Sequence, residues 1–434
     1  MNRTLKTLAA ALLGSGALLA ANPATSPAQA PAPSPAPAAF PSAPDAALAW
    51  NQVLLGLQAT PGVQPATMHP TYELAIVQSA IHDAVASIDG REAPYIAGVR
   101  APRTASKEAA ADAAAHDTLI ALYPAQRATL DADQTTAVSH VTNDARRAAG
   151  LAVGRRIARA VLAARRVDHA DATPPAFAPT GFPGDYAFTP PGFGQPVFTH
   201  WSHVRPFALT RASQFRPGPP PSLTGVHYAA ALHEVQMLGD AASTVRTPQQ
   251  TQIGLFWNAP IWASWNRIAQ TVSIAHHSDL FQSARTFAAL NLAFADSTIA
   301  FYDAKYAYRL WRPITAIRAA DTDGNPGTTA DPAWTPLSPT APDPSYPGAH
   351  ATISAAGARV LAAFFRDQGR FVVTSPTLPG AVRSFTSLAA AAQEASVSRI
   401  YNGNHTRLDE AAGETLGRDV AARVLGRRDN GNVL

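Results

Sequence analysis

The chain has 434 residues, of which 47% are hydrophobic and only 15% charged, so it can bury one large core or two mid-sized ones and is not disordered as a whole. The net charge of +4 is modest, and no run of lysine and arginine is long enough to follow a nucleic-acid backbone, so no nucleic-acid partner is expected. Cysteine is absent, which excludes disulfides, thiolate metal sites and cysteine nucleophiles.

Residues 1–30 have the pattern of a secretory signal peptide. Arg3 and Lys6 precede an apolar stretch, and an A-x-A cleavage motif ends at Ala30. An uncleaved membrane tether is the alternative, but the apolar stretch is short for a membrane span. No later stretch is long and apolar enough to cross a bilayer. We therefore expect a secreted or periplasmic protein whose mature chain has no transmembrane segment.

The rest of the chain predicts an all-α fold. Residues 31–44 form a Pro/Ala-rich linker, and alanine, the strongest helix former, dominates the composition. We predict two packed helical bundles, an N-terminal helical region over 45–240 and a C-terminal helical region over 241–430 that carries the candidate site. A long Pro/Gly/aromatic loop over 173–223 lies between the bundles. The predicted helices cover 45–58, 72–88, 106–123, 130–166, 226–240, 248–277, 281–311, 348–367, 381–400 and 405–426.

The first segment with chemical potential lies in the predicted helix over 281–311. Only three lysines occur against 31 arginines, and one of them, Lys305, lies seven residues before Arg312. Seven residues are nearly two helical turns, so both cations are expected on one face of a helix that Pro313 ends. A solvated basic stripe is the alternative, although the neighbouring residues are aromatic or apolar.

The second segment, from Ser345 to His350, contains a Pro-Gly turn and leads into a predicted helix. A helix that begins after such a turn has free backbone N–H groups, which together with the helix dipole favour an anion. His350 at this end is suited to proton transfer because histidine titrates near neutrality. The alternative is a polar histidine at a helix terminus without a role.

The third segment runs from Ser398 to Asp409. His405 and Asp409 are four residues apart, so the carboxylate can bind one imidazole nitrogen and leave the other free to attack or to ligate. Arg399 precedes this pair across a Gly turn. The alternative is an ordinary helix with an ion pair between neighbouring turns.

Taken together, the three segments resemble the signature of the type 2 phosphatidic acid phosphatase and vanadium haloperoxidase superfamily. That signature is Lys-x6-Arg-Pro, then Pro-Ser-Gly-His, then Ser-Arg-x5-His-x3-Asp. Its first and third parts match here without a gap, and the signature covers about a quarter of the chain. A looser resemblance around Ile81-His82-Asp83-Ala84-Val85 is to secreted bacterial haloperoxidase-like proteins.

The resemblance implies an oxyanion site. Lys305, Arg312 and Arg399 would surround the oxygens of a phosphate-like ligand, together with the backbone at Gly348 and Ala349. Three cations around a multiply charged oxyanion match the electrostatic requirement for tight binding.

The resemblance also implies the catalytic roles. His405 would bond the central vanadium or phosphorus, Asp409 would orient that imidazole, and His350 would act as acid and base. With vanadate as the cofactor, hydrogen peroxide and bromide or chloride would be the substrates, and Lys305 would polarise the bound peroxide.

Two residues depart from the family pattern. Gly348-Ala349 stands where the family usually has Ser-Gly, and the lost hydroxyl removes one hydrogen bond of about 1–3 kcal/mol. Asp343 stands where fungal chloroperoxidases carry an aromatic residue, and a carboxylate that faces the pocket would repel halide. Both departures weaken the case for halide oxidation more than the case for oxyanion binding.

The leading hypothesis is a vanadium-dependent haloperoxidase-like enzyme. The alternative is a secreted acid phosphatase that has no cofactor and hydrolyses phosphate monoesters through a phosphohistidine on His405. A third possibility is a non-catalytic oxyanion-binding protein, which would need neither His350 nor His405. Small molecules are the expected partners, and the sequence predicts no particular oligomeric state.

Overall fold

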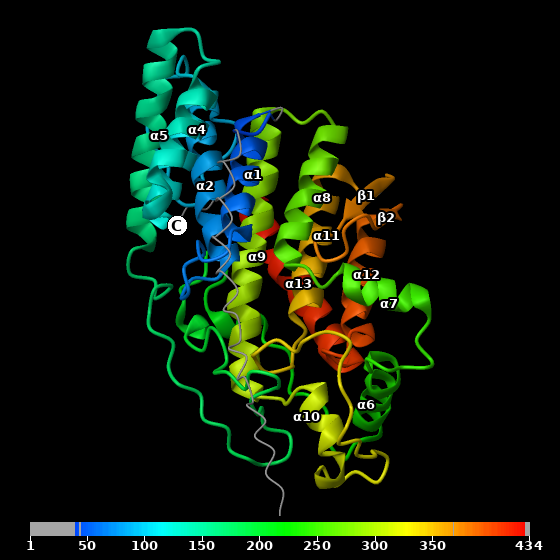
Figure 1. The fold of residues 1–434 in the computed structure, drawn as a ribbon. Coiled ribbons are helices and arrows are strands. Elements are labelled where there is room, and N and C mark those ends of the chain that lie inside the picture. Colours follow the sequence, from blue (N-terminus) through cyan, green and yellow to red (C-terminus); the bar gives the residue numbers. More distant parts are fainter. Residues whose placement is uncertain (1–39, 43–44, 368, 430–434) are drawn as a thin grey trace, which may run out of the picture. The chain divides into compact units, whose positions relative to one another are not determined.

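Helices dominate the fold (Figure 1). The computed structural model describes residues 40–42, 45–367 and 369–429, so the predicted signal peptide and most of the predicted linker lie outside the described residues. The described α-helices are α1 (Ala46–Ala59), α2 (Pro70–Asp89), α3 (Lys107–Leu122), α4 (Arg127–Val138), α5 (Asp144–Arg165), α6 (Val226–Gly239), α7 (Pro248–Phe256), α8 (Ile261–Ala275), α9 (Leu280–Tyr308), α10 (Pro313–Arg318), α11 (Ala349–Phe365), α12 (Leu388–Tyr401) and α13 (Arg407–Asp429). Short 3-10 helices cover Pro124–Gln126, Trp201–His203, Ala212–Phe215 and Ala320–Thr322. The predicted all-α class is confirmed.

Several predicted boundaries are wrong for local reasons. The predicted helix over 130–166 is two helices, because Asn143 begins α5 by accepting a hydrogen bond on its side chain from the N–H of Arg146. The predicted helix over 248–277 is also two helices, and Pro260 is the N-cap of the second. Capping and proline therefore override a continuous apolar pattern at both places.

A small hairpin lies where the sequence predicts the start of a helix at residue 381. β1 (Phe371–Thr374) pairs antiparallel with β2 (Val382–Phe385), and α12 begins only at Leu388. β1 alternates buried and exposed residues along its length, as a half-buried strand does. Four residues are too few for that alternation to stand out in the sequence.

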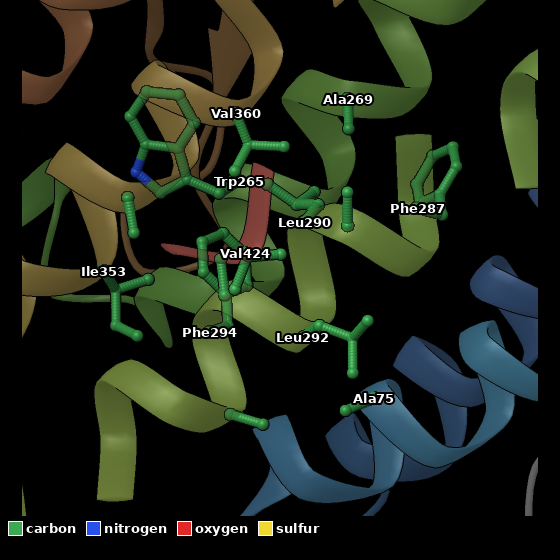
Figure 2. Packing of buried hydrophobic residues seen from close by; sticks show 14 of the residues in the cluster. Ala75, Trp265, Ala269, Phe287, Leu290, Leu292, Phe294, Ile353, Val360 and Val424 are labelled. Atoms are coloured by element: carbon green, nitrogen blue, oxygen red, sulfur yellow. The ribbon is translucent and has the colours of Figure 1, made fainter. Parts of the chain in front are cut away.

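The long helix α9 is central to the described core. It packs against α2 on one side and against α11 and α13 on the other, as Figure 1 shows. Its side chains Phe287, Leu290 and Phe294 are fully buried, and Figure 2 shows Phe294 in the same hydrophobic cluster as Ile353 and Val424. The described residues fall within one compact unit, so the proposed division near residue 240 stays a prediction.

Helices α11 and α13 approach each other closely because small residues line their contact. A Cβ atom added to Gly417 would overlap the carbonyl oxygen of Thr352 and would lie 2.9 Å from its carbonyl carbon. At the N-terminal ends of the two helices, the N–H of Gly348 donates to the carbonyl oxygen of Asp409 at 2.9 Å. This packing places the start of α11 next to the start of α13, where two of the candidate motifs lie.

The predicted loop over 173–223 is confirmed as a segment without α-helix, apart from two short 3-10 helices. Buried Asp296 on α9 anchors it, because its carboxylate accepts hydrogen bonds from the N–H groups of three consecutive residues, Phe207–Leu209, at 2.6–2.8 Å. The loop also reaches the end of α9, where the Tyr308 hydroxyl donates to the carbonyl of Pro217 at 2.6 Å. Among the described helices, none combines the length and the apolar character that a membrane span requires.

Candidate oxyanion site

Lys305 and Arg312 converge on one carboxylate. Lys305 is fully buried, and its Nζ donates to Asp343 Oδ1 at 3.2 Å and to the carbonyl of Ser345 at 3.1 Å. Arg312, 1% exposed, donates from Nη2 to the same carboxylate and from Nε to the carbonyl of Asp343 at 2.6 Å. The pKa of Lys305 is lowered to about 8: burial is the main cause, Asp343 opposes the shift, and the nearby Arg312 contributes to it.

The helix that carries Lys305 ends earlier than predicted. α9 stops at Tyr308, because Arg309 adopts a left-handed conformation with φ of 55° and caps the helix. Arg312 is the N-cap of α10, and Pro313 begins that helix instead of ending α9. The expectation of two cations on one helical face is therefore wrong. They meet because the chain turns between them.

The carboxylate of Asp343 faces Lys305 and Arg312. This is the orientation in which we expect it to repel halide. Burial alone would raise the pKa of Asp343, but the ammonium of Lys305 and the guanidinium of Arg312 together hold it below its usual range. Two of the three candidate oxyanion-binding cations are thus already paired with a carboxylate of the protein itself.

His405 is held as a neutral imidazole with a defined tautomer. Its Nε2 lies 3.1 Å from Arg312 Nη1, and a guanidinium can only donate, so Nε2 carries the lone pair and the proton is on Nδ1. Burial lowers the pKa of His405 well below its ordinary value, and Arg312 and Lys305 lower it further. A neutral imidazole with a lone pair is what a nucleophile or a metal ligand needs.

Asp409 lies close to His405 but orients it less directly than predicted. Asp409 Oδ2 is 3.6 Å from His405 Nδ1, which is too long for a hydrogen bond. The same oxygen accepts from Ser345 Oγ at 2.9 Å and from the N–H of Thr406 at 2.6 Å. Ser345 Oγ is in turn 3.4 Å from His405 Nδ1. Ser345 therefore bridges the pair, and no sequence spacing pointed to that role.

His350 and Arg399 are positioned by the segment between α7 and α8. His350 Nε2 donates to the carbonyl of Trp257 at 3.1 Å, and Arg399 Nη1 donates to Asn258 Oδ1 at 3.1 Å. Burial lowers the pKa of His350 well below its ordinary value, and the charge of Arg399 lowers it further. Trp257 and Asn258 lie far away in sequence, outside the three motifs.

Arg399 retains binding capacity. The pKa of Arg399 is lowered to about 10, above all by burial and also by the charge of Arg312. Its Nε is buried and has no hydrogen-bond partner among the described residues. An unsatisfied guanidinium N–H in a buried position is suited to an anionic oxygen.

The start of α11 is less open than the sequence predicts. The N–H of Gly348 is occupied by the carbonyl of Asp409, so the expectation that it is a free donor is wrong. The first hydrogen bond within α11 runs from the N–H of Thr352 to the carbonyl oxygen of Gly348. The N–H groups of Ala349 and His350 come before it and therefore have no acceptor within the helix. Ala349 thus remains a candidate backbone donor, whereas Gly348 does not.

Comparison with known proteins agrees with this geometry. Residues 285–430, which contain all three motifs, match the model of the VCPO second helical-bundle domain. The vanadium chloroperoxidase of Curvularia inaequalis is 27% identical over 256 residues, which cover 44% of this chain and 41% of that protein. These two matches support the expected membership of the vanadium haloperoxidase and type 2 phosphatidic acid phosphatase superfamily. The match thus spans less than half of that chloroperoxidase.

Solved structures of vanadium haloperoxidases share the fold. The first bacterial vanadium-dependent iodoperoxidase superposes with a TM-score of 0.75 at 24% identity, covering 88% of this chain and 95% of that one. A holo-type bacterial vanadium-dependent chloroperoxidase superposes with a TM-score of 0.68 at 16% identity, covering 87% and 95%. The similarity to these haloperoxidases extends beyond the motif region to nearly all of the described chain.

Proposed function

We propose that this chain is a vanadium-dependent haloperoxidase that oxidises halide with hydrogen peroxide. The observation that carries the proposal is the state of His405, a buried neutral imidazole whose Nε2 lone pair lies among cations. Membership of the superfamily and the fold shared with haloperoxidases support it.

The residues present fit vanadate. His405 Nε2 would bond the vanadium, and Lys305, Arg312 and Arg399 would neutralise its oxygens. The buried, unpartnered Nε of Arg399 is a donor that such an oxygen would satisfy. When bound, vanadate supplies a Lewis-acid centre that activates hydrogen peroxide toward attack by halide.

Proton movement falls to His350 in this proposal. A proton must leave hydrogen peroxide as it binds, and the low pKa of His350 keeps its ring neutral and able to accept that proton. Its Nε2–H is held by the carbonyl of Trp257, so Nδ1 is the nitrogen that accepts. The first-turn N–H of Ala349 is suited to hold a ligand oxygen nearby.

Asp343 bears on the choice of halide. Its carboxylate sits on Lys305 and Arg312, so it reduces the positive charge that those cations offer to a bound peroxide and repels an approaching anion. Iodide is the most easily oxidised of the three common halides and needs the least activation. We therefore propose oxidation of iodide first, then of bromide, and poor oxidation of chloride.

A phosphatase is the second candidate, and Asp343 favours it as well, because no halide has to approach this carboxylate. In that reaction His405 Nε2 would attack phosphorus and form a P–N bond, while the bond to the ester oxygen breaks and the leaving alcohol takes up a proton. His350 would have to carry a proton before the reaction begins, whereas its lowered pKa leaves the resting ring neutral, which is the starting state of a base and not of an acid. We therefore rank this function below halide oxidation.

The test is a matched pair of assays on the purified protein, with and without added vanadate. One assay measures peroxide-dependent oxidation of iodide, bromide and chloride, and the other measures hydrolysis of a chromogenic phosphate ester. We expect halide oxidation that requires vanadate and is inhibited by phosphate. Ester hydrolysis that vanadate inhibits would establish the phosphatase instead, and vanadate binding without either activity would indicate a non-catalytic oxyanion-binding protein.

Export is part of the proposal. The predicted signal peptide over residues 1–30 lies outside the described residues, and its pattern alone supports a secreted or periplasmic location. N-terminal sequencing of the protein recovered from its native compartment would test this: a mature chain that starts just after Ala30 is expected, and an intact Met1 would contradict it.

A further inference from the structure

The space beside Gly348 is filled by a carboxyl group. A Cβ atom built on Gly348 would overlap Oε1 of Glu410 and would lie 2.9 Å from its carboxyl carbon. The φ angle of Gly348 is −69°, which any residue can adopt, so backbone conformation does not require glycine there. Glycine is required because Glu410 occupies the place of a side chain at position 348.

Glu410 is a buried acid with an unused oxygen. It is 3% exposed, and Oε2 accepts a hydrogen bond from Ser396 Oγ at 3.1 Å. Oε1, the atom next to Gly348, is buried and has no hydrogen-bond partner among the described residues. A buried polar atom without a partner is costly, so a ligand that satisfies it is favoured.

The surroundings of Glu410 decide its protonation. Burial raises the pKa of Glu410 well above its ordinary value, and the neighbouring carboxylate of Asp409 on α13 raises it further. Glu414, one turn along α13, acts in the same direction, whereas Arg399 on α12 opposes the shift. The hydrogen bond from Ser396 also opposes the shift, but the net direction is upward and favours the neutral acid, which can donate a hydrogen bond.

We propose that Glu410 takes the place of the hydroxyl missing at position 348, and that its neutral carboxylic acid donates a hydrogen bond from Oε1 to an oxygen of the bound oxyanion. The glycine and the acid then form one coupled pair, in which the small residue before α11 makes room for the donor on α13. This inference rests on the oxyanion site of the proposed function, and it assigns to that site a binding residue outside the three motifs.

The experiment measures vanadate affinity by titration calorimetry and phosphate affinity by competition, with the unfolding temperature recorded beside them. Glu410→Gln keeps the shape and an N–H donor, so its vanadate affinity should stay within about threefold of the original chain. Glu410→Ala removes the donor and should weaken vanadate binding by roughly tenfold or more, as the loss of one hydrogen bond to a charged group implies. Glu414→Gln is the matched control, because Glu414 contacts the same Ser396 but does not adjoin Gly348, and it should leave affinity unchanged.

A coupled substitution tests the pairing itself. Gly348→Ser alone should weaken vanadate binding, because the new side chain meets Glu410. Gly348→Ser combined with Glu410→Ala should bind vanadate about as well as the original chain, because the serine hydroxyl has room and replaces the lost donor. Additive losses in the double variant would overturn the pairing.

The direction of the affinity change decides the role of Glu410. An ionised Glu410 would repel the oxyanion, so Glu410→Gln and Glu410→Ala would both bind vanadate more tightly, and that result would overturn the inference. Affinities unchanged in both variants would overturn it too. Failure of the proposed function is distinguishable: a chain that binds vanadate with these affinity changes but oxidises no halide refutes the haloperoxidase and leaves the role of Glu410 standing.

Discussion

Replacing Asp343 with asparagine should make the protein less stable and its oxyanion site stronger. Asp343 is 6% exposed, and its carboxylate accepts hydrogen bonds from both Lys305 and Arg312 through the same oxygen, Oδ1. In the ligand-free protein it is the counterion that compensates these two buried cations. Asp343→Asn keeps the shape and one oxygen but removes that negative charge.

The size of both effects depends on the burial of this cluster. Breaking a buried ion pair by removing one partner costs about 3–5 kcal/mol, and the retained amide oxygen places Asp343→Asn near the low end, at about 3 kcal/mol. In general, two like unit charges at a separation of about 6 Å repel each other by about 3 kcal/mol at an effective dielectric constant of about 20. Removal of the Asp343 charge should tighten vanadate binding by at least roughly tenfold, with about a hundredfold as the upper bound.

Thermal unfolding with and without vanadate measures both effects in one series. The Asp343→Asn protein should unfold at a lower temperature without ligand, and saturating vanadate should raise that temperature by more than in the original chain, because tighter binding adds stability. Asp185→Asn is the control, since Asp185 pairs with Arg309, which is outside the cluster. A variant that is equally stable and binds vanadate no more tightly would refute the role of Asp343 as the internal counterion.

Three further substitutions test other parts of the structure. Burial raises the pKa of Glu73 from 4.5 to about 7, so the contribution of Glu73 to the free energy of unfolding is fully present below pH 4.5 and is lost as the pH rises through about 7. Glu73→Gln should flatten this loss, which amounts to about 3 kcal/mol, and identical pH profiles of unfolding in the two proteins would contradict the prediction. Gly417→Ala should destabilise the protein by about 1–3 kcal/mol in denaturant unfolding, because the new Cβ atom disturbs the contact between α11 and α13. Gly426→Ala on the same helix, where a Cβ atom has open space, should stabilise the protein by up to about 1 kcal/mol, and equal effects of the two substitutions would refute close helix packing as the reason for Gly417. Asn258→Ala removes a hydrogen-bond acceptor of the Arg399 guanidinium and should weaken vanadate binding roughly tenfold in calorimetry, with little change in unfolding temperature. Unchanged vanadate affinity would show that Arg399 does not need Asn258 to hold it in position.

The fold class was predictable from the sequence because helical periodicity and alanine content act over long stretches. The short elements were not. The hairpin of β1 and β2 has four residues in each strand, and the end of α9 depends on a left-handed conformation at Arg309 that an arginine rarely adopts. Such local choices are decided by tertiary contacts, such as the bidentate pair of Arg309 with Asp185, which lies 124 residues away in sequence.

The candidate site was predictable where it depends on residue type and order. Lys305, Arg312 and His405 come together as the motifs imply, although the two cations do not share one helical face as predicted. Residues that act through contacts between distant segments left no signal of their own. Glu410 is one such residue, because only the packing of α13 against the start of α11 brings its side chain next to Gly348. Asn258 is another, because only the fold brings it to Arg399.

The most direct test of the proposed oxyanion site is a crystal structure of the protein soaked with vanadate, with vanadium located by its anomalous scattering. We expect one vanadium at bonding distance from His405 Nε2, with its oxygens contacted by Lys305, Arg312 and Arg399. Vanadium bound elsewhere, or no vanadium at His405 when vanadate is saturating, would contradict the assignment of this site.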